Sequence, residues 1–152
     1  MKDSDRPILE VRELRTYFGA RRAPVRAVDG VSFSIGAGET VALVGESGCG
    51  KSVTALSLAR LVAEAGFYAG GEVLFGGEDV LKMAPARLRR LRGAEISYVF
   101  QEPATSLNPV FRVGDQIAEA VRLHRPDLDA REETIRQMRT VGLPSPEQRM
   151  RA

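Results

Sequence analysis

Several residue types that mark particular protein classes are scarce in this chain. Its 152 residues include one cysteine, one histidine and no tryptophan. The single cysteine, Cys49, excludes an internal disulfide and agrees with a reducing compartment. No apolar run approaches the roughly 18 residues that would cross a bilayer, and residues 1–7 lack the apolar core of a signal peptide. We therefore expect a globular chain that stays in the cytosol.

The chain also lacks a large excess of one sign of charge, because 22 Lys and Arg residues nearly balance 20 Asp and Glu residues and the formal net charge is +2. This value is too small to argue for a nucleic-acid partner. One local arginine cluster raises the question: Arg87, Arg89, Arg90 and Arg92. Leu88 and Leu91 lie among these arginines at helical spacing, which favours a short surface helix with a solvated basic face. We therefore expect no nucleic-acid binding.

The most informative segment is an apolar stretch, residues 40–44, that leads into the pattern G-x-x-x-x-G-K-S between Gly45 and Ser52. Its glycines let backbone N–H groups turn around a polyphosphate, and a helix that starts near Gly50 directs its positive end at the same oxygens. Lys51 can reach the β and γ phosphates, and the Ser52 hydroxyl suits Mg²⁺. The predicted nucleotide-binding residues of this loop are Gly45, Glu46, Ser47, Gly48, Cys49, Gly50, Lys51, Ser52 and Val53.

Alternation of apolar residues predicts strands before and after this loop. Residues 8–18 and 25–35 are expected to form an antiparallel β layer, and residues 40–44, 70–77 and 96–100 to form further strands. A helix over residues 53–62 should follow the loop. The order of strands and helices indicates an α/β fold with a helical appendage.

The appendage begins after a loop with two prolines, residues 101–109. A first helix is predicted from the apolar positions Val113, Ile117, Ala120 and Val121. A second helix should begin after a cap at Asp129 and end at Gly142, with an apolar stripe formed by Ile135, Met138 and Val141.

Four blocks in this order resemble an ABC transporter ATP-binding subunit: residues 27–33, 38–39, 44–53 and 99–103. Residues 105–109 resemble the branch of the family that powers bacterial import of dipeptides, oligopeptides or nickel. The resemblance implies a P-loop NTPase fold, with the antiparallel β layer, a RecA-like core and the start of the helical subdomain. It also implies an incomplete domain over residues 1–152, in which residues 1–103 form the β layer and core and residues 104–152 begin the helical subdomain.

The same resemblance implies two more site residues. Phe18 would stack on the adenine ring, although Tyr17 stands next to it and both could be plain strand residues. Gln101 would approach Mg²⁺ and the attacking water, which makes it a catalytic residue beside Lys51 and a metal ligand beside Ser52. The open alternative is that residues 96–103 are a degraded strand of the kind that ends in Asp-Glu.

By resemblance, the intact protein would be an ATPase at the cytoplasmic face of the bacterial inner membrane. Its partners would be transmembrane permease subunits, a second ATP-binding subunit and, indirectly, a substrate-binding protein. The chain carries no Leu-Ser-Gly-Gly-Gln-like signature and no switch histidine, since His124 lies at the end of a predicted helix. We therefore expect a truncated chain that binds Mg-ATP without useful hydrolysis. A small-molecule kinase or a GTPase remains the alternative.

Overall fold

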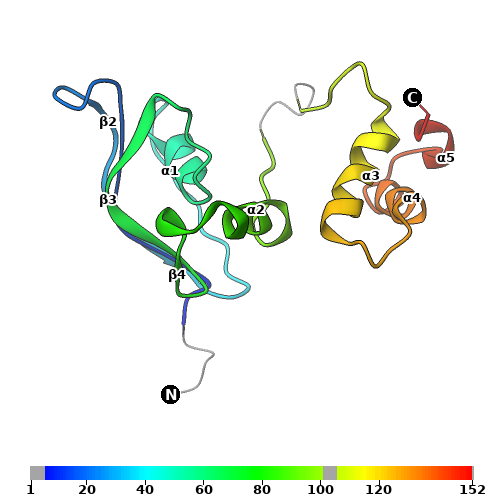
Figure 1. Cartoon of the computed structure of the whole chain (residues 1–152), viewed down its shortest axis with the longest axis horizontal. Helices are drawn as coiled ribbons and strands as arrows, with labels where there is room; N and C mark the ends of the chain where they lie inside the picture. Colours follow the sequence, from blue (N-terminus) through cyan, green and yellow to red (C-terminus); the bar gives the residue numbers. More distant parts are fainter. Residues whose placement is uncertain (1–5, 101–105, 152) are drawn as a thin grey trace. The chain divides into compact units, whose positions relative to one another are not determined.

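The computed structural model describes residues 6–100 and 106–151. The chain divides into two compact units, residues 1–91 and residues 92–152, and each is described by itself (Figure 1). The division expected at residue 103 stays a prediction. In the part of the chain that the structure describes, no helix has the length and apolar character that crossing a membrane requires.

The first unit is built on a four-stranded sheet with the order β2-β1-β3-β4. Its strands are β1 (Leu9–Phe18), β2 (Val25–Ile35), β3 (Gly66–Phe75) and β4 (Glu78–Asp79), and every neighbouring pair is antiparallel. The expected β layer is therefore confirmed. Strand β3 begins four residues before the expected position 70, because Gly66 pairs with Phe18 at the end of β1.

One face of β1 supplies much of this unit's core. Leu9, Val11, Leu14 and Thr16 are all buried, although simple alternation would put 11 and 14 on opposite faces. The register shifts between Val11 and Leu14 in the pairing with β2, which marks a β-bulge. The extra residue keeps Leu14 and Thr16 on the buried face.

Three short helical segments accompany these strands: one lies between β2 and β3 in the chain, and the other two follow β4. Helix α1 (Lys51–Ser57) packs against β1 and β2, η2 (Val80–Lys82) is a 3₁₀ turn, and α2 (Pro85–Ala94) follows it. The expectation that α1 continues to residue 62 is wrong. Its C-cap is Leu58, and Arg60 adopts the left-handed conformation with φ +54°, which stops the helix.

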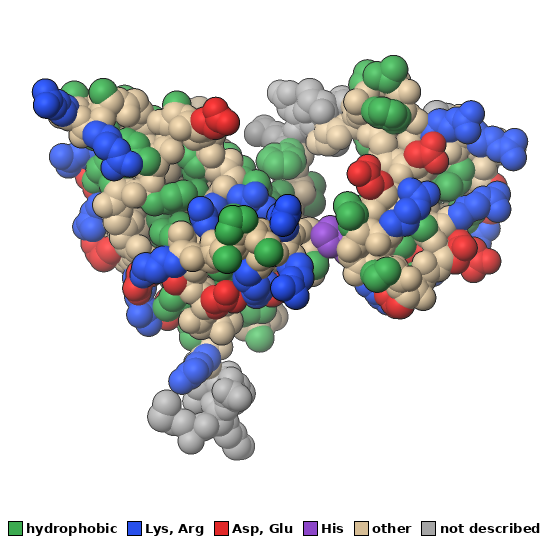
Figure 2. Space-filling view, in the orientation of Figure 1, with side chains coloured by type: hydrophobic (Ala, Val, Ile, Leu, Met, Phe, Trp, Pro, Cys, Tyr) green, Lys and Arg blue, Asp and Glu red, His purple; other side chains and the backbone are tan. Residues whose placement is uncertain are grey.

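Helix α2 has the predicted basic surface. Its regular part ends at Leu91, since Arg92 and Gly93 have non-helical dihedral angles. Leu88 and Leu91 are buried, whereas Arg89 is exposed. Figure 2 shows the Lys and Arg side chains that gather over α2 on the face presented.

The second unit contains α3 (Val113–His124), α4 (Ala130–Thr140) and α5 (Pro146–Arg149). The predicted cap of α4 is confirmed, because the Asp129 carboxylate accepts a hydrogen bond from the Glu132 N–H at 2.8 Å. At the other end, Gly142 N–H donates to Arg139 O and Leu143 N–H to Met138 O, a Schellman arrangement.

The buried stripes of these two helices differ from the predicted ones. Ala118 and Val121 of α3 and Thr134 and Met138 of α4 are buried. Ala120 and Val141, which were expected in the stripes, are exposed, Val141 by 72%. The cause is that α3 and α4 pack mainly on one another, which turns a narrower face inward than the spacing of apolar residues suggests.

Two strands expected in the core are not formed. Residues 40–44 and 96–100 belong to no strand, apart from an isolated bridge between Arg92 and Ile96. Val44 is 88% exposed and Val99 is fully exposed. Apolar composition alone does not make a strand, because a strand needs a neighbouring strand to accept and donate its backbone hydrogen bonds.

Candidate functional site: the phosphate loop

The phosphate loop, residues 45–53, follows the segment 40–44 and runs into the first turn of α1. Gly50 is the N-cap of α1 and has φ +95°, which favours glycine. A Cβ atom at this position would also collide with the carbonyl oxygen of Ala27 in β2. Close approach to β2 therefore fixes the point at which the loop becomes a helix.

The side chain of Lys51 folds back into this loop. Its Nζ donates hydrogen bonds to the carbonyl oxygens of Gly45 at 2.8 Å and Glu46 at 2.6 Å, and lies 3.5 Å from the Sγ of Cys49. The loop thus surrounds the ammonium group. Phosphate oxygens bind an ammonium group more strongly than neutral carbonyl oxygens do, so a polyphosphate can draw Lys51 away from the loop carbonyls.

The other loop residues are open to a ligand. Glu46, Ser47, Gly48, Cys49 and Ser52 are exposed, and Val53 is half-buried. The next residue, Thr54, is buried, and its hydroxyl donates to the carbonyl oxygen of Gly50 at 3.0 Å. The exposed loop is therefore followed directly by a helical turn that includes the buried Thr54.

Two neighbouring aromatic residues end β1, and they face opposite sides of the sheet. The Tyr17 hydroxyl donates to Asp29 Oδ1 at 2.6 Å, and the Tyr17 ring meets that of Phe67 edge-on. This hydrogen bond raises the pKa of Tyr17 and lowers that of Asp29. Tyr17 is therefore already engaged by other groups of the sheet.

The ring of Phe18 is half-buried and lies over Gly66. A Cβ atom on Gly66 would approach Phe18 Cε1 to 2.9 Å and would collide with Val62. The absence of a side chain at 66 therefore makes room for this ring beside the segment that follows α1.

Gln101, the expected catalytic glutamine and metal ligand, lies outside the described residues. In residues 6–100 and 106–151, no group of three or more His, Cys, Asp and Glu residues could hold a metal ion. Of the two expected Mg²⁺ ligands, Ser52 and Gln101, the structure describes Ser52. Its hydroxyl is exposed and is an oxygen ligand of the kind that Mg²⁺ prefers.

A buried pair of hydroxyl groups behind the loop was not predicted from the sequence. Thr16 Oγ1 of β1 and Ser57 Oγ of α1 lie 2.9 Å apart, and both residues are fully buried. The sequence feature that could have indicated this pair is Thr16 itself, a polar residue two positions after Leu14 on the buried face. Its partner is 41 residues away in sequence, so no local pattern could have indicated the pair.

A family model described as ABC transporter matches residues 28–151, which include the phosphate loop. The chain belongs to the ABC transporter family. This match confirms the resemblance inferred from the sequence blocks. Within the ABC transporter family, the solved structures most useful for comparison are ATP-binding cassettes.

One is a dimeric cassette in a post-hydrolysis state bound to ADP and Pi, with a TM-score of 0.76, 19% identity, and coverage of 90% of this chain and 58% of that chain. Another dimeric bacterial ABC transporter cassette has a TM-score of 0.69, 21% identity, and coverage of 83% and 52%. At these identities the likeness shows the fold, which is the α/β fold of a P-loop NTPase cassette.

Sequence relatives in the ABC transporter family are named for import. A probable peptide ABC transporter ATP-binding protein of Sinorhizobium fredii is 44% identical over 94% of this chain and 44% of its own length. The oligopeptide transport ATP-binding protein AppD of Bacillus subtilis is 43% identical over 95% and 45%. A glutathione import ATP-binding protein, GsiA of Pectobacterium atrosepticum, is 49% identical over 92% and 24%. The chain spans less than half the length of these relatives.

Proposed function

We propose that this chain binds Mg-ATP through the phosphate loop as part of the ATP-binding subunit of a peptide importer. The observation that carries the proposal is the loop wrapped around Lys51, with Nζ 2.6 Å from Glu46 O and 2.8 Å from Gly45 O. A single positive charge held among exposed backbone groups is suited to a polyphosphate.

Several loop residues have a role in this proposal. Lys51 moves from the loop carbonyls to the β and γ phosphates, and the backbone amides of Gly48, Cys49, Gly50 and Ser52 donate to phosphate oxygens. Ser52 and Gln101 are proposed to hold Mg²⁺, which would neutralise phosphate charge when bound. Phe18 is proposed to stack on adenine, because Tyr17 is engaged by Asp29.

For the whole protein, we propose ATP hydrolysis coupled to import, with permease subunits and a second ATP-binding subunit as partners and a substrate-binding protein acting indirectly. The proposed location is the cytoplasmic face of the bacterial inner membrane. Relatives named for peptide, oligopeptide and glutathione import support a peptide cargo. Nickel remains the alternative cargo from the resemblance. For the 152-residue chain alone, we propose binding without sustained hydrolysis.

The test is titration of the chain with Mg-ATP, measured by calorimetry, for wild type and Lys51→Ala. Removal of the one positive charge in the loop should weaken binding by about 10-fold or more, since hydrogen bonds to charged groups contribute roughly 1.5–3 kcal/mol.

The matched control is Lys82→Ala, which removes a lysine paired with Asp79 at 2.8 Å on η2. This variant should bind as wild type does. Equal affinity of Lys51→Ala and wild type would refute the site. A parallel titration with GTP addresses the GTPase alternative, which predicts rejection of ATP, whereas stacking on Phe18 tolerates both bases.

A further inference from the structure

A buried hydrogen bond joins the strand that carries Phe18 to the helix that carries Lys51. Thr16 lies two residues before Phe18 in β1, and Ser57 is the last residue of α1. Their hydroxyl oxygens are 2.9 Å apart, and both residues have no exposed surface. Breaking such a contact would leave a buried hydroxyl group without this partner.

The direction of this hydrogen bond follows from the bonds around it. The Ser57 hydroxyl has one hydrogen, which it donates to the carbonyl oxygen of Val53 at 2.7 Å. Thr16 therefore donates to Ser57. The chain of bonds runs from β1 through Ser57 to Val53, a residue of the phosphate loop.

Thr16 and Phe18 project from the same face of β1, because side chains alternate along a strand. The regular pairing of Thr16 with Tyr68 and Phe18 with Gly66 preserves this alternation in the pair with β3. The Phe18 ring rests over Gly66, beside Val62. The residue that contacts α1, Thr16, and the aromatic residue Phe18 are therefore next to each other on the same face of β1.

We propose that the Thr16–Ser57 hydrogen bond is a positioning contact for nucleotide binding. It fixes the aromatic ring at the end of β1 relative to the phosphate loop at the start of α1, so that the base and the phosphates of one ligand can bind at the same time. The inference rests on the proposed function and extends it, since it says why base and phosphates bind together rather than independently.

The test compares two probes in calorimetric titrations: Mg-ATP, which needs both ends of the site, and magnesium tripolyphosphate, which needs only the loop. Thr16→Val keeps the shape of the side chain and removes the hydroxyl. We expect it to weaken Mg-ATP binding by about threefold to tenfold, the size of one net hydrogen bond. Binding of tripolyphosphate should stay within about twofold of wild type.

A double-mutant comparison distinguishes positioning of the Phe18 ring from a general loss of structure in the protein. In a Phe18→Ala background, where no ring remains to be positioned, Thr16→Val should change Mg-ATP affinity by less than about twofold. Thr16→Ser restores the hydroxyl and should restore wild-type affinity. Ser57→Ala, which removes the acceptor, should reproduce the Thr16→Val result and replaces it if Thr16→Val does not fold.

The matched control is Thr134→Val in α4. Thr134 is also fully buried, and its hydroxyl donates to Ala130 O at 2.6 Å within its own helix. This variant loses a buried hydroxyl group but changes none of the proposed nucleotide-binding residues. It should bind both probes as wild type does.

Equal weakening of both probes by Thr16→Val, no weakening of Mg-ATP binding, or a full additional loss in the Phe18→Ala background would each overturn the inference. If Lys51→Ala abolishes binding while Thr16→Val binds normally, the positioning role alone fails. If Lys51→Ala binds both probes normally, the proposed function fails and the positioning role fails with it.

Discussion

Cys49 lies two positions before Lys51, the first residue of α1, with Sγ 3.5 Å from Nζ. Cys49 is exposed and is the only cysteine of the chain, so a thiol reagent reports on this loop alone. We expect saturating Mg-ATP to slow alkylation of Cys49 by a maleimide, because a polyphosphate in the loop covers the thiol. Mass spectrometry of the labelled chain measures the rate.

Lys51→Ala provides the control for this labelling experiment. In that variant Mg-ATP should give little protection, because the phosphates lose their charged partner. A labelling rate of wild type that does not respond to Mg-ATP would show that the nucleotide does not occupy the loop around Cys49.

For single residues, the sequence predicted the members of the phosphate loop but not the contacts of the residues behind it. The glycines and Lys51 are close in sequence, so their spacing alone predicts a loop that wraps a phosphate. The engagement of Tyr17 by Asp29, 12 residues away, depends on the pairing of β1 with β2. The local sequence therefore could not predict which of the two aromatic residues, Tyr17 or Phe18, is hydrogen-bonded to another strand of the sheet.

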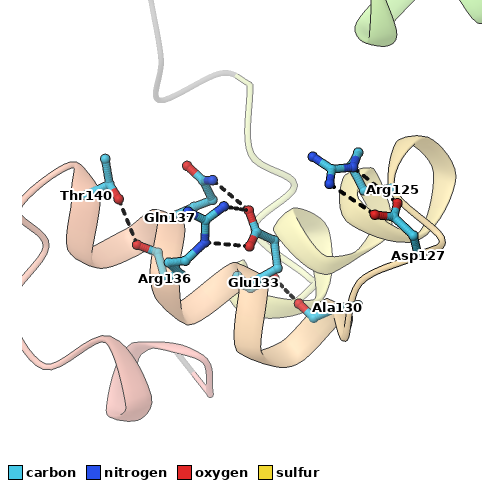
Figure 3. Close-up of polar contacts among 8 residues, drawn as sticks. Arg125, Asp127, Ala130, Glu133, Arg136, Gln137 and Thr140 are labelled. Carbon is cyan, nitrogen blue, oxygen red and sulfur yellow. Dashed lines mark hydrogen bonds and ion pairs between the residues drawn. The ribbon is translucent and has the colours of Figure 1, made fainter.

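Among the elements, α4 has a carboxylate whose ionisation should influence stability. Glu133 accepts hydrogen bonds from Arg136 at 2.6 and 2.7 Å and from Gln137 at 2.7 Å (Figure 3). The Arg136 bonds, followed by the Gln137 bond, lower the pKa of Glu133 from its ordinary 4.5 to about 2.

Because this pKa is lower in the folded state than in the unfolded chain, the interaction stabilises the fold above about pH 4.5. The stabilisation declines as the pH falls from about 4.5 toward 2. We expect Glu133→Gln to lower the free energy of unfolding at pH 7 and to differ little from wild type near pH 2. Urea denaturation of both chains, followed by helical circular dichroism, measures this difference.

The matched control for the pH experiment is Asp127→Asn. Asp127 is paired with Arg125 before α4 begins, and this pairing lowers the pKa of Asp127; Figure 3 shows the two hydrogen bonds from Arg125 to the Asp127 carboxylate. The helical signal of this variant should follow wild type more closely than that of Glu133→Gln. A difference between wild type and Glu133→Gln that stays constant down to pH 2 would contradict the assigned pairing.

Elements stabilised by local contacts were predictable, whereas elements that need distant partners were not. The Asp129 cap and the Gly142 end of α4 involve residues within a few positions of each other. A strand at 40–44 or 96–100 requires a neighbour from elsewhere in the chain, and no strand pairs with either segment among the described residues.

For the molecule as a whole, exposed apolar side chains predict weak cooperativity. Val44 is 88% exposed, Val99 fully and Phe100 54%. Large apolar side chains left in water do not contribute to a packed core. We expect the 152-residue chain to bind a hydrophobic dye and to unfold over a broad temperature range. Scanning calorimetry and dye fluorescence measure the two properties.

A double substitution supplies the control for this prediction. Val44→Thr with Val99→Thr keeps the side-chain shape at two exposed positions and should reduce dye binding without lowering the unfolding midpoint. A sharp transition whose calorimetric and van't Hoff enthalpies agree would contradict weak cooperativity.

The sequence by itself determined the family, the phosphate loop, the antiparallel pair β1 and β2, and the ends of α4, because each depends on residues close together in the chain. Tertiary structure decided the bulge that keeps Leu14 and Thr16 buried, the length of α1, the faces that α3 and α4 bury, and the contact of Thr16 with Ser57. These features depend on which surfaces meet after the chain folds. Side chains far apart in sequence become neighbours only then, and burial energy and hydrogen bonding, rather than local spacing, select among the possible arrangements.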